Sequence, residues 1–438
     1  MLAKMKLVVV LGGVLLFALA QIGVAQEVEE GMATFDLGEI VVTPTKTERT
    51  VGDLSLSVSV ITKEVIEAST AQTATDILSI LPGVFVHKTG PFGRTDVVIR
   101  GHGSRGRRVM VLVDGKPEKM GLFGCTVTHS LPLDNVERIE VVRGPASVLY
   151  GSDALGGVIN IITKKPKEKF EGDITLSYGS YDTQVYRLRQ GGNLERFHYY
   201  FSIDERKTRG HLPNSDYEHK NFTWRLGGNL TDNLEAVFTS RYFDGFKREP
   251  SPATADTWND YERGSYDLTL NVDFENISGM FKVYRNFGRH MFSDGWHAKD
   301  YTTGAMLHTN FVPIVGNTFS LGGEFRRQGG DVLNGGIKGN YHKDEFAFFI
   351  HDEQRLFDEV LIASGGIRYN DDEYSGRMFC PQAGLVFNVR EGTIIRAAFN
   401  KGFRSPQLNE LKFFGLSNLV VNPEETWNYE VGLNQKIT

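Results

Sequence analysis

The sequence has 438 residues, of which 40% are hydrophobic and 11% aromatic, with a formal net charge of −6 and two cysteines. This length is sufficient for two or three domains, and the acidic balance gives no general attraction to nucleic acid. Cys125 and Cys380 are too few for a disulfide framework. A nucleic-acid-binding protein and a disulfide-stapled scaffold are therefore excluded.

The first 25 residues have the pattern of a secretion signal. Lys4 and Lys6 precede an apolar run over 7–20, and Gly23-Val24-Ala25 offers a small-residue cleavage site. The run is shorter than the ~20 residues that a membrane-spanning helix needs. We therefore predict a signal peptide over 1–25 and export from the cytoplasm.

Residues 26–49 form an acidic leader that ends in a β-prone run. Main-chain hydrogen bonding to a partner protein requires only such an extended segment, and proline ends the pairing because it has no N–H. An ordinary first strand of the next domain is the alternative. The run reads Glu39-Ile40-Val41-Val42-Thr43-Pro44.

Residues 50–168 have a mixed α/β pattern. A short amphipathic helix is predicted over 73–81, because Pro82-Gly83 is a common stop signal. A helical turn is expected over 146–150. The predicted strands are 57–61, 97–100, 108–113, 138–142 and 158–163. These elements predict one small α/β domain.

Residues 169–438 change to a period of two. In the clearest case, apolar residues from Tyr266 to Phe274 alternate with polar ones from Asp267 to Asp273. The pattern predicts about 14 strands. Their connections alternate between short turns and long loops. This alternation is typical of a transmembrane barrel and is not expected of a soluble β-sandwich. The expected long loops are 205–220, 245–263, 288–303, 327–341, 371–380 and 403–425.

Several motifs of the chain are similar to those of one family. From about residue 36 onward, the sequence resembles the TonB-dependent outer-membrane receptors. The resemblance implies a mainly β fold in which an N-terminal α/β plug domain sits inside an antiparallel transmembrane β-barrel. The motifs are EIVVTPT at 39–45, DILSILPGV at 76–84, VVIRGHGSRGRRVMVLVDGKP at 97–117, VERIEVVRGPASVLYGSDALGGVINIIT at 136–163, KGFRSPQLNEL at 401–411 and NPEETWNYEVGL at 422–433.

The resemblance also implies site residues. The run 39–44 matches the box that pairs with the periplasmic protein TonB, and Arg100 and Arg143 match two plug arginines that are paired with barrel glutamates. Glu324 and Glu430 are the matching glutamates, and the alternation of their strands directs both inward. Charge-assisted pairs are expected there; the alternative is that these glutamates only line a wet interior.

The chain departs from the family in strand number. Family barrels have about 22 strands, and the C-terminal Lys436-Ile437-Thr438 lacks the expected aromatic residue. A 14-strand barrel would be about 28 Å across and a 22-strand barrel about 44 Å, whereas the plug needs roughly 36 Å. We therefore expect an incomplete barrel that lacks about 8 strands, from a fragment or an interrupted reading frame.

Two plug loops, 90–96 and 118–130, are expected to face outward and touch ligand. Met120, Cys125 and His129 are soft or borderline metal ligands, but their spacing matches no tetrahedral pattern. An apolar contact loop with an incidental thiol is the alternative, so no metal site is assigned. For haem, His87 and His129 are the available plug residues. The ligand-contact candidates are Phe92, Arg94, Met120, Phe123, Cys125 and His129.

The remaining patterns argue against catalysis. The run 101–106 fits GxGxxG, but a strand follows it where a dinucleotide site needs a helix. No catalytic residue set or cofactor is predicted. The expected function is TonB-coupled uptake of a metal chelate, such as a ferric siderophore or cobalamin, across the outer membrane, with lipid and TonB as partners. The alternatives are a receptor for haem, copper or another metal, and a non-functional truncated receptor.

Overall fold

The computed structural model describes residues 40–41, 46, 48–88, 92, 95–103, 107–131, 133, 135–250, 256–334, 337–390, 392–413 and 421–436. All of them belong to one compact unit, 37–438. The predicted signal peptide lies outside the described residues, as do Glu39, Val42, Thr43, Pro44 and Arg94.

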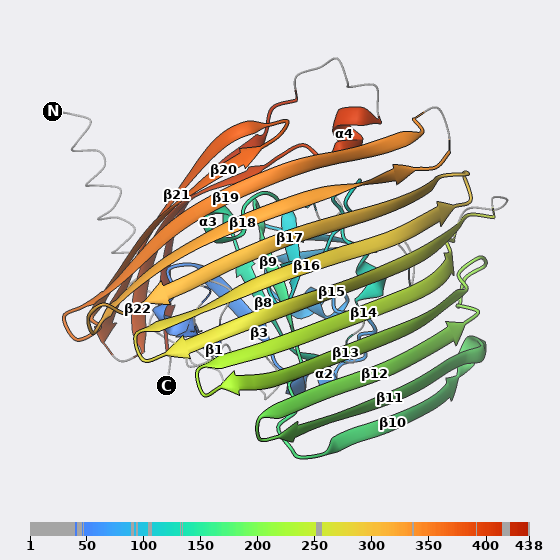
Figure 1. Cartoon of the computed structure of the whole chain (residues 1–438), viewed down its shortest axis with the longest axis horizontal. Helices are drawn as coiled ribbons and strands as arrows, with labels where there is room; N and C mark the ends of the chain where they lie inside the picture. The colour runs from blue at the N-terminus through green and yellow to red at the C-terminus, as the bar shows by residue number, and fades with distance from the viewer. Residues whose placement is uncertain are drawn as a thin grey trace, which may run out of the picture. The chain divides into compact units, whose positions relative to one another are not determined.

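The N-terminal part of this unit is the plug, a small α/β domain (Figure 1). Its central sheet has the order β3-β8-β9-β6-β7, in which only β6 and β9 are parallel. Two further pairs are β1–β2 and β4–β5. The elements are β1 Ile40–Val41, β2 Arg49–Thr50, η1 Val51–Asp53, β3 Ser57–Ile61, α2 Lys63–Ala68, η2 Ile77–Ile80, β4 Val84–Lys88, β5 Thr95–Ile99, β6 Val109–Val113, β7 Lys116–Pro117, η3 Thr128–Ser130, β8 Val136–Arg143, α3 Ser147–Tyr150 and β9 Gly157–Thr163.

The predicted helix over 73–81 is wrong in extent. Only Ile77–Ile80 is helical, and it is a 3-10 helix. The Asp76 carboxylate accepts hydrogen bonds from the backbone N–H of Gln72 and Thr73, and such local side-chain bonds compete with helix formation. The helix α2 and the strand β4 were not predicted.

The C-terminal part is one antiparallel sheet of 14 strands in sequence order, β10 to β23. The predicted fold class and strand number are confirmed. The strands are β10 Glu171–Gly179, β11 Thr183–Leu194, β12 Phe197–Thr208, β13 Tyr217–Thr231, β14 Leu234–Arg248, β15 Trp258–Phe274, β16 Ile277–Phe292, β17 His297–Phe311, β18 Asn317–Val332, β19 Gly339–Leu356, β20 Leu361–Asp372, β21 Gly376–Arg390, β22 Thr393–Arg404 and β23 Glu424–Gln435, with η4 Ser180–Asp182 after β10 and α4 Leu408–Lys412 before β23.

The two faces of this sheet differ as the alternation predicts. On β15, Tyr266 and Leu268 are exposed on the convex face, whereas Asp267 and Thr269 are buried. In a membrane barrel, the outward apolar face contacts lipid and the inward face is polar. None of the helices in the described part of the chain is both long and apolar enough to cross a membrane.

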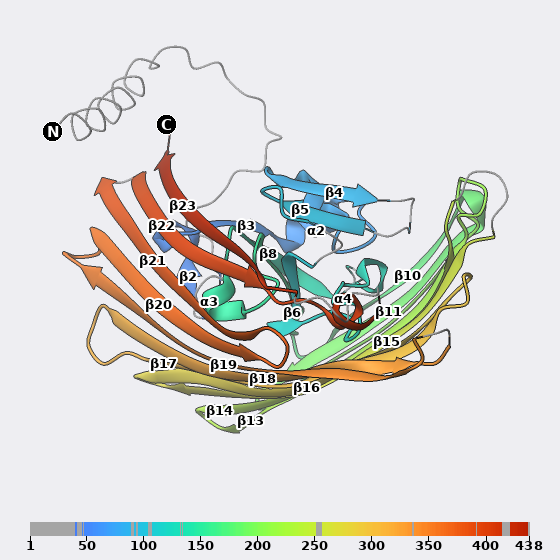
Figure 2. The ribbon, with the colours of Figure 1, turned by 90° about the horizontal axis from the view of Figure 1, so that it is seen from above.

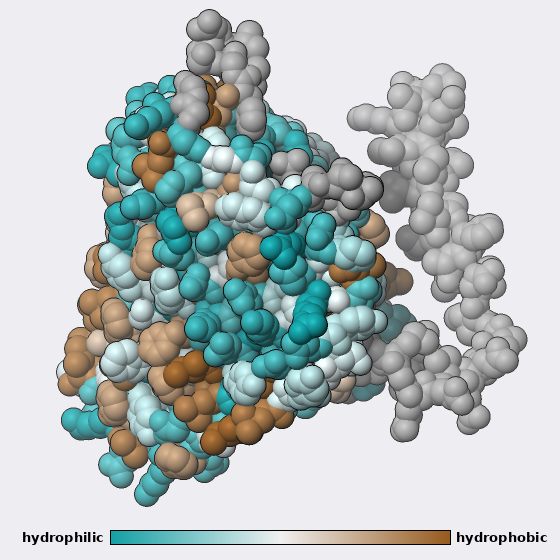
Figure 3. Space-filling view, turned by 90° about the vertical axis from the view of Figure 1, so that its right-hand side faces the viewer, coloured by the Kyte–Doolittle hydropathy of each residue, from teal (hydrophilic) through white to brown (hydrophobic). Residues whose placement is uncertain are grey.

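The long connections are shorter than predicted. The expected loop 288–303, for example, contains the end of β16 and the start of β17, which pair as far as Met291↔His297. The ladder continues because its backbone hydrogen bonds do not depend on apolar side chains. The longest connections are 209–216, 249–257 and 405–423, and all lie at one end of the strands, here called the outer end. Hydrophilic side chains cover much of that end (Figure 3).

The plug packs on the concave face of the sheet, and β10 and β23 lie at opposite ends of the curved wall (Figure 2). Among the described strands, β10 and β23 are not paired with each other. One apolar core lies wholly within the plug. A second joins the plug helix α3 to barrel residues that include Phe349, Cys380 and Phe403. The wall therefore encloses the plug on one side, and its two edge strands are unpaired within the described part of the chain.

Candidate functional site

The leader is held against the barrel wall. Strand β1 pairs with β2 through Ile40↔Thr50 and Val41↔Arg49, and Val41 is 0% exposed. Lys46 places its Nζ 3.1 Å from Glu324 Oε1 and over the rings of Tyr150 and Phe349, at 5.1 and 4.7 Å from their centroids. Burial lowers the pKa of Lys46 despite the attraction of Glu324. These contacts fix the segment that follows the expected TonB box.

Arg100 and Glu430 are brought together. The guanidinium makes two parallel hydrogen bonds with the carboxylate, Nη1 to Oε2 at 2.6 Å and Nη2 to Oε1 at 2.9 Å. The side chains are 33% and 17% exposed. This bidentate geometry links the plug to β23, the edge strand of the wall.

Arg143 makes no hydrogen bond to Glu324 or Glu430, so the expected pairing of both plug arginines with these glutamates holds for Arg100 alone. Arg143 is paired in register with Ser57 on β3 and donates to the hydroxyls of Ser57 and Ser59 and to the Pro82 carbonyl. Glu324 instead accepts from Lys46 and from Arg368, whose Nη2 lies 2.8 Å from Oε2. The plug-side partner of Glu324 is therefore Lys46 of the leader and not Arg143 of β8.

Further ion pairs cross from the plug to the wall. No local pattern in the sequence predicts them, because the partners are far apart in the chain. The pair Lys116–Asp267 is buried, and removal of one of its partners is costly because it leaves an unpaired buried charge. The pairs are Asp114–Arg225 at 3.3 Å, Lys116–Asp267 at 3.3 Å, Glu118–Arg241 at 2.8 Å, Arg49–Glu353 at 2.9 Å and Asp53–Arg355 at 3.1 Å.

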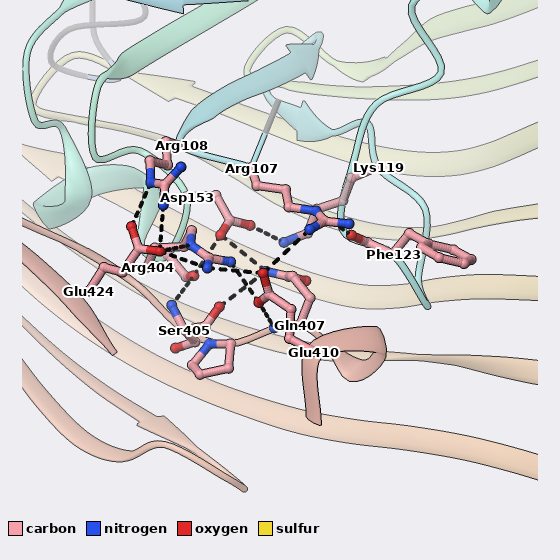
Figure 4. A network of polar contacts seen from close by, with 12 residues as sticks. Arg107, Arg108, Lys119, Phe123, Asp153, Arg404, Ser405, Gln407, Glu410 and Glu424 are labelled. Carbon is pink, nitrogen blue, oxygen red and sulfur yellow. Dashed lines mark hydrogen bonds and ion pairs between the residues drawn. The ribbon is translucent and has the colours of Figure 1, made fainter. Parts of the chain in front are cut away.

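At the outer end, a polar network joins the plug to the connection between β22 and β23 (Figure 4). Arg404 donates to Glu410 at 2.9 and 3.1 Å and to Glu424 at 2.8 Å. Arg108 makes two hydrogen bonds to Glu424, at 2.6 and 2.8 Å, and Arg107 donates to Glu410 and to the Phe123 carbonyl. The arginines beside the GxGxxG run therefore bind carboxylates. Arg404, Glu410 and Glu424 were not singled out by the sequence analysis. They lie within two of the family-like motifs, and this position is the signal that could have identified them.

The same network continues into the plug. Gln407 Nε2 donates to Asp153 Oδ1 at 3.2 Å, and Asp153 forms a buried ion pair with Lys119. Asp153 lies three residues after Tyr150, whose ring Lys46 covers. Contacts thus reach from the outer connection to Asp153, and the short chain segment 150–153 connects Asp153 to the ring that Lys46 covers.

A cavity of about 240 Å³ lies at the outer end between the plug and the wall. Four of the predicted ligand-contact residues line it, and they all come from the loop 118–130, here called the pocket loop. The wall contributes Lys247, Tyr261 and Phe292, among others. The four plug residues are Met120, Phe123, Cys125 and His129.

Phe92 does not line this cavity. It stacks on Tyr217 with the ring centroids 3.9 Å apart. His87 is exposed on β4, whereas His129 is buried among Tyr217, Phe243 and Tyr261. The two histidines considered for haem therefore have different environments.

An aromatic cluster borders the cavity. Phe123 of the pocket loop packs edge-on against Trp296 and Phe413, with ring centroids 5.3 and 6.0 Å apart, and Phe413 also contacts Tyr341. These wall residues come from three different outer connections or strand ends. The pocket loop is thus held by aromatic contacts as well as by Arg107.

The comparisons with known proteins agree with this architecture. Residues 50–158 match the family model of the TonB-dependent receptor plug domain, and residues 167–437 match that of the TonB-dependent receptor-like β-barrel. The chain belongs to the TonB-dependent receptors, a family of outer-membrane proteins.

Two curated relatives illustrate the similarity. The vitamin B12 transporter BtuB of Vibrio vulnificus strain YJ016 is 27% identical over 421 residues, covering 90% of this chain and 67% of its own. The iron-regulated outer membrane virulence protein of Vibrio cholerae O1 El Tor is 28% identical over 426 residues, covering 88% and 63%. The chain therefore spans about two thirds of the length of these relatives.

Two solved structures share the fold. A mutant of the ferric enterobactin receptor PfeA from Pseudomonas aeruginosa, in complex with enterobactin, has a TM-score of 0.74 at 20% identity, covering 88% of this chain and 70% of its own. The siderophore receptor PirA from Pseudomonas aeruginosa has a TM-score of 0.72 at 21% identity, covering 87% and 72%.

Proposed function

We propose that this chain provides the plug and part of the wall of a receptor that takes a bulky metal chelate across the outer membrane. The ligand class is a ferric siderophore or a cobalamin-like chelate. The observation that carries the proposal is the cavity, because the plug loop expected to touch ligand lines it together with the outer strand ends. The similarity to BtuB, a vitamin B12 transporter, and to PfeA, a ferric enterobactin receptor, supports the ligand class.

The cavity takes only one part of such a ligand. Pockets for small molecules usually have volumes of ~300–1,000 Å³, and the space here is about 240 Å³. Phe123, Tyr261 and Phe292 offer aromatic faces, whereas Lys247 is paired with Glu249 at 2.9 Å and Arg107 with Glu410 at 3.4 Å. An aromatic arm of the chelate fits this lining, while its remainder lies among the outer connections.

Ligand binding is coupled to the leader through the plug. A ligand that displaces the pocket loop also displaces Lys119, which is paired with Asp153. Asp153 follows α3, and the Tyr150 ring at the end of α3 is part of the seat of Lys46. A shift of α3 therefore weakens the contact between Lys46 and the Tyr150 ring. The leader is then free to pair with TonB by β-augmentation.

Ligand binding is tested with the purified full chain in detergent, titrated calorimetrically with ferric enterobactin and, separately, with cyanocobalamin. One of the two is expected to bind, and Phe123→Ala is expected to weaken that binding about tenfold. The matched control is Phe85→Ala on the exposed face of β4. Absence of binding for both chelates, or equal losses in the two variants, would contradict the assigned pocket.

Coupling to TonB is tested by uptake in cells. Ile40→Pro removes a backbone donor from the expected box, so uptake should fall to the level of cells lacking TonB while chelate binding is unchanged. Uptake that persists in this variant would show that the box lies elsewhere.

A further inference from the structure

The outward face of the wall changes from apolar to charged along β16, which lies next to β17 on the convex side (Figure 1). From the end opposite the outer end, the outward positions are Ile277, Gly279, Phe281 and Val283, and the next is Arg285. The tilted strand rises by ~20 Å between Ile277 and Arg285. The apolar band of a membrane barrel is ~25 Å tall. Arg285 therefore lies at the outer boundary of this band.

Aromatic residues mark the same level on the outward face. Tyr266 of β15 is the register partner of Arg285 and is 45% exposed, and Phe287 of β16 is 36% exposed. Tyr301 of β17 is the register partner of Phe287. Aromatic side chains gather where hydrocarbon meets the lipid headgroups. Their positions support the same boundary, at which the phosphates of the outer leaflet lie.

Arg285 extends along this boundary toward β17. Its Nη1 donates to Thr303 Oγ1 at 2.7 Å, and its guanidinium carbon lies 4.6 Å from the centroid of the Tyr301 ring. The edge formed by Nε and Nη2 is left for another acceptor. Among the described residues, no carboxylate oxygen lies within 4.0 Å of this guanidinium. A charge beside hydrocarbon is costly without a partner, and a lipid phosphate is the anion available at this level.

Lys299 provides a second positive charge on the same face of β17. Its side chain is exposed, and it has no ion pair within the described ranges. Its register partners are Arg289 of β16 and Asp331 of β18. Asp331 accepts a hydrogen bond from Asn340 at 2.7 Å and forms no ion pair with Lys299.

The neighbouring arginines are already neutralised. Arg289 is paired with Glu262 of β15, and Arg327, the register partner of Thr303 on β18, is paired with Asp344 at 2.6 Å. The unmatched positive charge on this part of the outward face therefore belongs to Arg285 and Lys299.

We propose that Arg285 and Lys299 bind the phosphate group of a membrane lipid in the outer leaflet. The Nε–Nη2 edge of Arg285 makes two parallel hydrogen bonds with the phosphate, and the Thr303 hydroxyl holds the guanidinium in position. The acyl chains lie along Phe281 and Val283, which are 43% and 38% exposed. The site is on the outward face of the wall, so it is separate from the cavity proposed for the chelate.

The test is native mass spectrometry of the purified full chain in a neutral detergent, with dioleoylphosphatidic acid as the lipid. One lipid is expected to stay bound, whereas dioleoylglycerol, which has the same chains without the phosphate, should not. Arg285→Gln should weaken retention at least about tenfold, which corresponds to ~1.4 kcal/mol, and Lys299→Gln should weaken it by a smaller factor. Arg285→Lys keeps the charge and should retain more lipid than Arg285→Gln.

Two matched controls remove a charge from the same outward face. Arg377→Gln on β21 removes a partner of Asp371, and Lys220→Gln on β13 removes a lysine whose register partners are Glu205 and Asp244. Both should leave retention unchanged, and circular dichroism should show that every variant is folded. If Arg285→Gln does not fold, Arg285→Lys and Lys299→Gln decide the outcome.

Three results would overturn the proposal: no lipid retained, equal retention of the two lipids, or equal losses in the site and control variants. An excess of inorganic phosphate should leave the lipid bound, because the acyl chains contribute to its affinity. Displacement by inorganic phosphate would show a site for the free ion and overturn the assignment to a lipid. Lipid retention by a chain that binds neither chelate would contradict the proposed uptake function and leave this site intact.

Discussion

The interior of the plug and its interface with the wall are built from different interactions. Inside the plug, the sheet and its covering segments bury aliphatic side chains such as Ile139, Val141 and Ile159. At the interface, apolar contact gathers around α3 and around the pocket loop, and ion pairs and hydrogen bonds join the plug to the wall between these two places. Apolar burial is non-directional and tolerates small shifts, whereas an ion pair has one good geometry. We therefore expect the interior of the plug to stay folded under conditions in which its ion pairs with the wall break.

The largest effect is expected in the plug core. Ile139 is 0% exposed in the apolar core, and Ile139→Ala should destabilise the plug by about 2–5 kcal/mol because it leaves a cavity. Hydrogen exchange of the β8 and β9 amides measures this change. Ile80→Ala, at a 48% exposed position, is the control and should cost far less. Equal costs would mean that the interior is not the main source of stability.

The next effect separates the two plug arginines. Arg143 is buried and donates to three oxygens within the plug; hydrogen bonds from a charged group contribute about 1.5–3 kcal/mol. Arg100 is a third exposed, and its pair with Glu430 should contribute at most about 1 kcal/mol. Arg143→Ala should therefore lower the hydrogen-exchange protection of the β3 and β8 amides more than Arg100→Ala does. The reverse order would contradict the observed partners.

A smaller effect is expected at the leader. Lys46→Met removes the charge that joins Glu324 and the two rings. Trypsin should then cleave after Arg49 about tenfold faster, which corresponds to ~1.4 kcal/mol of lost attachment. Lys167→Met, at an exposed position, should leave the cleavage rate unchanged. An unchanged rate in Lys46→Met would mean that β1–β2 pairing alone holds the leader.

The smallest effect depends on pH. Burial opposes ionisation of Glu410, but hydrogen bonds from Arg404 and the Gln407 backbone outweigh it and lower the pKa of the carboxyl. Its contribution to stability is therefore full above the unfolded pKa of about 4.5 and is lost as pH falls through the folded pKa. Exchange protection of α4 should fall in this acidic range, and Glu410→Gln should flatten the dependence. A parent chain whose α4 protection does not change with pH would contradict the role of this ion pair.

The sequence was a good guide where a local pattern determines the structure. The alternation from Tyr266 to Phe274 predicted β15 and its two faces, and the family-like motifs indicated both Arg100 and Glu430 as members of a plug–barrel charge set. It was a poor guide where the partner is remote. Nothing near Glu324 in the chain indicates Lys46, and the cavity is defined only when the pocket loop meets β14 and β15. Loop lengths were overestimated because polar residues continue the ladders beyond the apolar band.

Within the part of the chain that the structure describes, the outer edges of β10 and β23 have no partner strand, and their geometry determines how a neighbouring strand can pair with them. In hydrocarbon, every unsatisfied backbone group costs several kcal/mol, so each edge must be covered by a further strand, whatever its origin. Trp427, Tyr429 and Val431 project outward from β23. A strand that pairs with this edge must therefore place its apolar residues opposite these three, on the same outward face. A register slip of one residue would turn the apolar residues of the added strand toward the plug.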